Sequence, residues 1–148
     1  MKKRRNLKDI FLKLSLITLF GIAFGHLEGV VVYYLRLILT SSLPLQNWTN
    51  SLLFIEQTRE FATIVMLVVF AWLVGKSKWE KLAIFLWTFA IWDLFYYLSL
   101  YIMLGWPSSL STMDVLFLIP APWVAPVWVP IAVMILFLII SWYILTKK

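Results

Sequence analysis

Apolar residues fill four long stretches of this 148-residue chain, and short polar segments separate them. A helix that crosses the hydrocarbon core of a bilayer, about 30 Å thick, needs about 20 residues. The four stretches reach that length at about residues 14–39, 51–74, 82–104 and 115–145. The pattern therefore predicts an all-α integral membrane protein whose single domain, residues 1–148, is a four-helix transmembrane bundle.

The fourth stretch contains an unusual concentration of proline: Pro120, Pro122, Pro126 and Pro130. Each proline lacks an N–H group and clashes with the preceding turn, which disfavours an unbroken helix. Residues 115–145 would also form a helix of about 46 Å, longer than a straight span requires. We therefore expect a fourth segment broken by proline, with an interfacial or re-entrant piece at about 115–123 and a span at about 126–145.

The composition excludes several other classes of protein. Hydrophobic residues make up 63% of the chain and charged residues only 14%, whereas soluble domains have about 25% charged residues. The absence of cysteine excludes disulfides, thiolate metal sites and a cysteine nucleophile. The sequence also contains no phosphate-binding glycine loop, serine-hydrolase elbow or His-Glu-x-x-His motif. We expect a multi-pass protein in contact with lipid, in the cytoplasmic membrane of a bacterium or archaeon.

The positive charges are unevenly distributed along the chain, which has a net charge of +6. Lysine and arginine precede the first stretch, separate the second from the third and end the chain, whereas residues 40–50 and 105–114 contain none. Cationic flanks resist translocation, so this pattern predicts that both the N and C termini are cytoplasmic. Because topology explains the basic surplus, we expect no nucleic-acid partner.

Three glycines lie four residues apart in the first stretch, at Gly21, Gly25 and Gly29. At about 100° per residue they fall on one face of a helix, and Glu28 falls on the same face. Small residues let a neighbouring helix approach closely. This face is therefore a candidate contact for a second copy of the chain in a homo-oligomer, and a larger membrane complex is the alternative partner.

Ionisable groups inside the apolar stretches are the candidate functional residues, because charges at membrane depth are costly and usually face the protein interior. Counting from the outer ends at 1.5 Å per residue places Glu28 and Asp93 both at a depth of about 18 Å, so we expect them to meet. Arg36 is expected to pair with Glu56 between helices, and Glu56 is also placed to pair with Arg59 within its own helix. The candidate acid–base residues are Glu28, Glu60, Asp93 and His26, and the candidate ligand-binding residues are Arg36, Arg59, Glu56, Tyr96 and Tyr97.

The four buried acids outnumber the two arginines and leave a surplus of negative charge. An unpaired carboxylate in low dielectric takes up a proton or holds a cation. The favoured function is therefore proton- or cation-coupled binding or translocation, at a site open to the extracytoplasmic side. Asp114, at the outer boundary, is interpreted as a helix cap, with a place at the mouth of the site as the alternative.

Two other functions and a metal site remain open. One is an intramembrane enzyme that acts on a lipid or isoprenoid by carboxylate and histidine acid–base chemistry, with an arginine holding a phosphate or carboxylate. The other is an accessory subunit of a larger complex. A divalent metal such as Zn, Mn or Fe would use His26, Glu28, Glu60 and Asp93. Against the metal, His26 and Glu28 point about 160° apart on a regular helix.

Overall fold

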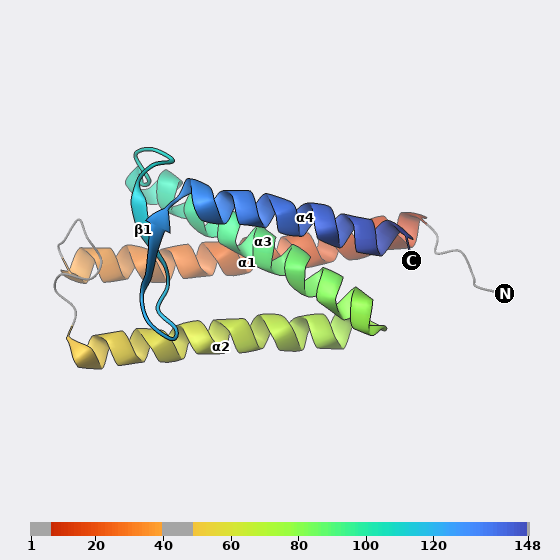
Figure 1. Cartoon of the computed structure of the whole chain (residues 1–148), viewed down its shortest axis with the longest axis horizontal. Coiled ribbons are helices and arrows are strands. Elements are labelled where there is room, and N and C mark those ends of the chain that lie inside the picture. The colour runs from red at the N-terminus through yellow and green to blue at the C-terminus, as the bar shows by residue number, and fades with distance from the viewer. Residues whose placement is uncertain (1–6, 40–48, 148) are drawn as a thin grey trace.

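The computed structural model describes residues 7–39 and 49–147 and contains four long helices and one β-hairpin (Figure 1). The elements are α1 (Leu7–Leu39), α2 (Asn50–Val74), α3 (Lys78–Leu104), β1 (Met113–Phe117), β2 (Trp123–Pro126) and α4 (Trp128–Lys147). All four helices are long and apolar enough to cross a membrane, which confirms the four predicted helical stretches. The basic residues at positions 2–5 and at 148, which the topology prediction uses, lie outside the described residues.

Helix α3 forms the centre of the bundle. It packs against α1, α4 and α2, and it runs diagonally between them in Figure 1. Half of its apolar window is buried, against 28% or less for each of the other three helices. Helix α3 is therefore the most enclosed of the four helices, whereas α1, α2 and α4 each leave a broad apolar face exposed.

The glycine face of α1 lies against α3, which confirms the predicted close helix contact. A Cβ atom added at Gly25 would lie 2.3 Å from the Trp92 backbone oxygen, and one at Gly29 would lie 2.8 Å from Ser99 Cβ. At Gly21 the added atom would lie 2.8 Å from Ile91 Cγ2. Because α3 of the same chain occupies this face, the face cannot serve as the seam of a homo-oligomer, and that prediction is wrong.

The helix ends near the two termini are fixed by local caps and by an ion pair. Ser77 caps α3 by accepting from Glu80 N at 3.2 Å. Lys13 of α1 donates to Glu80 Oε1 at 2.7 Å and to the Val74 carbonyl oxygen at 2.8 Å. These contacts join α1, α2 and α3 at one end of the bundle. We call this the terminal end, and the opposite end the hairpin end.

The proline-rich segment forms an antiparallel hairpin, which the sequence did not predict. Met113 pairs with Pro126 and Val115 with Val124, and an irregularity lies between Val115 and Phe117. Helix α4 begins only after this hairpin and contains a single proline, Pro130, in its first turn, where a missing N–H is tolerated. The expected break in the fourth segment is therefore a pair of strands. Figure 1 shows the hairpin extending across the bundle from α4 towards α2.

Candidate functional site

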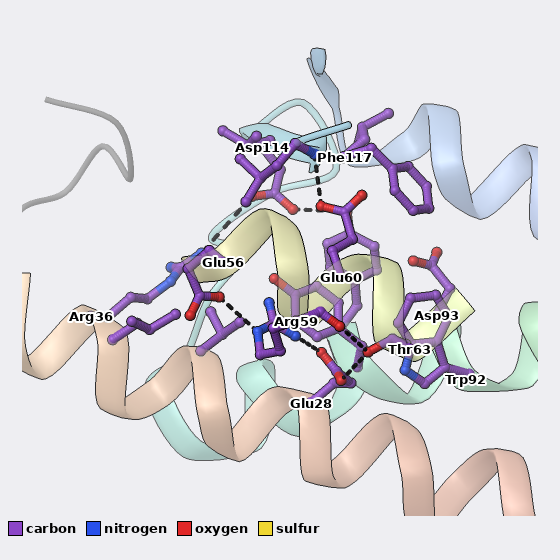
Figure 2. A pocket seen from close by; sticks show the side chains of 17 residues that line it. Glu28, Arg36, Glu56, Arg59, Glu60, Thr63, Trp92, Asp93, Asp114 and Phe117 are labelled. Atoms are coloured by element: carbon purple, nitrogen blue, oxygen red, sulfur yellow. Dashed lines mark hydrogen bonds and ion pairs between the residues drawn. The ribbon is translucent and has the colours of Figure 1, made fainter. Parts of the chain in front are cut away.

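A cavity of about 110 Å³ lies at the hairpin end, between α1, α2, α3 and the hairpin (Figure 2). The sequence predicted a shared site for nine side chains, and eight of them line this cavity. These are Glu28, Arg36, Glu56, Arg59, Glu60, Asp93, Tyr96 and Tyr97. The ninth, His26, lies elsewhere.

Arg59 joins two of the acids. Its Nε donates to Glu56 Oε2 at 2.7 Å, one turn away on α2. Its Nη1 donates to Glu28 Oε2 on α1. Thr63 donates to the other Glu28 oxygen at 2.9 Å. Both carboxylates are buried, so the guanidinium compensates charges that water does not reach. The predicted pairing of Glu56 with Arg59 is confirmed.

Arg36 pairs with the hairpin and makes no ion pair with Glu56. Its Nη2 lies 4.0 Å from Asp114 Oδ1, and its guanidinium lies 3.7 Å from the centre of the Trp106 ring. The predicted pair of Arg36 with Glu56 is wrong, because Arg59 binds Glu56 and the hairpin brings Asp114 to Arg36.

Asp114 lines the cavity, although the sequence favoured a different role for it. It lies in β1, where it caps no helix, so its interpretation as a cap is wrong. Its side chain is buried and accepts from the Tyr97 hydroxyl at 2.9 Å. Burial raises the pKa of the Asp114 carboxyl, while the Tyr97 hydrogen bond and the charge of Arg36 oppose that rise. Its place at the boundary of an apolar stretch was the one signal available, and no periodicity supported it.

Of the five acids that line the cavity, Glu60 and Asp93 make no ion pair among the described residues. Glu60 Oε2 accepts from the Leu118 N–H at 2.8 Å, while its Oε1 is buried without a hydrogen-bond partner in the described part of the chain. The same holds for Asp93 Oδ2 and for the indole Nε1 of Trp92. Glu28 and Asp93 share the cavity as predicted, but the carboxylate of Glu28 is bound by Arg59 and Thr63.

Acidic groups therefore predominate in the lining of the cavity. Five carboxylates and two guanidiniums line it, a formal charge of −3 if every group is ionised. The acids are Glu28, Glu56, Glu60, Asp93 and Asp114, which come from all three helices around the cavity and from β1. Their ionisation is costly in this environment without further positive charge.

His26 does not belong to this cavity. Its side chain is exposed on α1, and its Nδ1 lies 3.1 Å from the Ser99 hydroxyl. Among residues 7–39 and 49–147, no group of three histidine or acidic side chains is arranged to hold a metal ion. The proposed metal set of His26, Glu28, Glu60 and Asp93 is therefore not assembled, because Glu28 faces the cavity and His26 projects from another side of the same helix.

The fold and the site define a candidate multi-pass membrane protein with buried carboxylates in ion pairs. No protein-family model matches the chain, and no match to it was found among curated proteins or solved structures.

Proposed function

We propose that this cavity binds a proton or a cation, and that the protein is a small proton- or cation-coupled carrier. One observation carries the proposal. Glu60 and Asp93 each have a buried oxygen without a partner in the described residues, while both arginines at the cavity already pair with other acids.

The charge on these two acids can be neutralised in two ways. A buried charge without a partner costs several kcal/mol, so a carboxyl group there is stabilised when it takes up a proton or when a cation enters beside it. Either event neutralises charge in the cavity and can be reversed when the ligand leaves. Acids in membrane spans serve proton and ion pathways for this reason.

The hairpin forms one wall of the cavity, and its position can change when a proton or a cation binds. Leu118 at the turn of the hairpin donates its N–H to Glu60 Oε2, and Gln57 Nε2 donates to the Leu118 oxygen at 3.0 Å. A proton on Glu60 removes the charge of its carboxylate and so weakens the hydrogen bond from the Leu118 N–H, which holds the hairpin against α2. Proton binding and the position of the hairpin are therefore coupled in this proposal.

The arrangement of charges favours this function over a lipid or isoprenoid enzyme. Such an enzyme would use Arg36 or Arg59 to hold an anionic group. Arg59 already binds Glu28 and Glu56, and Arg36 already faces Asp114. An anion would have to displace these acids and enter a cavity in whose lining acidic groups predominate, whereas a cation is attracted to it.

The test is proton uptake into proteoliposomes that contain a pH-sensitive dye and the purified full chain. Wild type is expected to carry protons, and the variants D93N and E60Q are expected to lose most of this flux. The matched control is D9N, because Asp9 is exposed at the start of α1, far along the helix from the cavity. Equal flux in wild type, D93N and E60Q would contradict the proposal.

Infrared spectroscopy tests binding separately from transport. Wild type should show a band for a protonated carboxyl group that disappears at high pH, and D93N or E60Q should reduce that band. A spectrum without any such band, in a protein that also binds no cation, would remove the basis of the proposed function.

A further inference from the structure

Aromatic side chains form the part of the cavity wall around Asp93. Trp92, Tyr96 and Tyr97 are neighbours of Asp93 on α3, and Phe117 contributes from β1. Trp92 and Tyr97 are 7% and 6% exposed, so these rings are held by the packing around them. The cavity therefore combines acids without ion pairs and aromatic rings.

This combination suits a different ligand from a bare metal ion. Calcium and magnesium take about six to eight oxygen ligands that converge on one point. The acids here surround a cavity, and in the described residues no three of them converge. Aromatic side chains also line this cavity, and the negative faces of aromatic π systems attract organic cations.

The size of the cavity agrees with this distinction. Its volume of about 110 Å³ is several times the roughly 10–15 Å³ that a cavity needs to hold one water molecule. That space is more than one dehydrated ion requires and is suited to a cation with a few carbon atoms.

One side chain that is more than nine-tenths buried, Glu60, points to a ligand through an oxygen that lacks a partner in the described part of the chain. Glu60 is 8% exposed and leaves Oε1 without a partner among the described residues. This residue lines the cavity. A ligand with N–H groups would satisfy such a carboxylate oxygen.

We propose that the cavity binds a small organic ammonium ion, with the Asp93 carboxylate as its counter-ion and the aromatic side chains in contact with its carbon atoms. This inference rests on the proposed function, because it names the cation that the site takes. A free amine and the ethanolamine headgroup of a lipid present the same chemistry, so both are sources of the ligand.

The test is calorimetric titration of the purified full chain in detergent with methylammonium, sodium and calcium as separate probes. We expect methylammonium to bind at least about tenfold more tightly than sodium or calcium, a difference that the aromatic wall provides. D93N should lose this binding and D9N should keep it. F117L should weaken it about two- to fivefold, because leucine fills space without a π face.

The outcomes separate this inference from the proposed function. Binding of sodium or calcium in preference to methylammonium, or D93N-sensitive proton flux without methylammonium binding, would overturn the ammonium site and leave the carrier proposal standing. Absence of both proton flux and cation binding would overturn both. Equal methylammonium binding by wild type and by D93N, with both eluting as monodisperse folded protein, would also overturn the inference.

Lipid nanodiscs then identify the source of the ligand. If the ligand is a lipid headgroup, phosphatidylethanolamine will reduce methylammonium binding and phosphatidylglycerol will not. If the ligand is a free amine, the two lipids will give the same binding. Both results support the ammonium chemistry and assign it to one source.

Discussion

At the scale of single residues, the site is organised by which acid has a cationic partner. Arg59 binds Glu56 through Nε and Glu28 through a terminal nitrogen, so one planar group serves acids on two helices. A lysine has one compact charge and cannot reproduce this fork. Arg59 is therefore the cationic partner of Glu28 and Glu56, while Glu60 and Asp93 make no ion pair among the described residues.

We expect R59Q to lower the free energy of unfolding by about 2 to 3 kcal/mol, because Glu28 and Glu56 become buried charges without a partner. The cost stays below that of a fully buried pair since the Arg59 side chain is 28% exposed. Unfolding in mixed micelles, followed by circular dichroism, measures it. Adding E28Q to R59Q should recover part of the loss.

K147Q is the control for this comparison, since Lys147 is exposed at the end of α4 and surface changes usually stay within about 0.5 kcal/mol. A loss for R59Q no larger than that of K147Q, or no recovery in the double variant, would show that the ion pairs contribute little.

Asp114 gives a pH dependence with a defined sign. Its pKa is raised above 3.8 in the folded protein, chiefly by burial. Between the two pKa values the folded state binds more protons than the unfolded state, so stability falls as pH rises through this window. We expect the stability of wild type relative to D114N to decrease across this range.

Unfolding titrations of both proteins at a series of pH values from about 4 to 7 measure this difference. A difference that stays constant, or that increases with pH, would show that the hydrogen bond from Tyr97 and the charge of Arg36 outweigh burial.

At the scale of elements, the packing of α1 on α3 depends on small side chains. Gly25 approaches the Trp92 backbone oxygen, which cannot rotate away as a side chain can. The four-residue spacing of the glycines predicted the contact correctly because helical geometry places them on one face. It could not identify the partner helix, since the same face suits a second chain equally well.

G25A should therefore destabilise the bundle by about 1 to 3 kcal/mol, the usual cost of overpacking. A23V adds more carbon to an exposed position of α1 and is the matched control. The two variants are compared by thermal unfolding in the same detergent. Equal stability of G25A and wild type would show that the helices can separate without cost.

The hairpin was the element that the sequence could not predict. Residues 115–119 form a continuous apolar run and do not alternate between polar and apolar positions, so periodicity does not distinguish a strand from a buried helix. The prolines showed only where a helix would be interrupted. Strand pairing between β1 and β2 then determined the position of Asp114.

At the scale of the whole molecule, the bundle has two chemically different ends. The terminal end contains Lys13 with Glu80, and the hairpin end contains the acidic cavity. The distribution of lysine and arginine predicts that the hairpin end faces away from the cytoplasm. In that orientation the cavity receives its ligand from the outside.

Cysteine labelling tests this orientation without background, because the chain contains no cysteine. We expect a membrane-impermeant maleimide added to intact cells to modify S108C, which lies at the hairpin end, and to modify K147C only after permeabilisation. Both positions are exposed. The reverse pattern would invert the topology and place the cavity opening on the cytoplasmic side.

The sequence by itself indicated the four long apolar helices and most of the side chains that line the cavity. Apolar runs of spanning length leave few alternatives to membrane helices. The acids, arginines and tyrosines within those runs face inwards because exposure to lipid is costly, and eight of the nine expected side chains line one cavity for that reason.

Only the tertiary structure decided how these groups are paired. It placed Asp114 beside Arg36, covered the glycine face with α3 and left His26 exposed on another side of α1. These outcomes depend on the rotation of each helix and on a hairpin that crosses the bundle. Helical periodicity fixes which residues share a face, but the face that each helix presents to its neighbours is set by packing between segments distant in the chain.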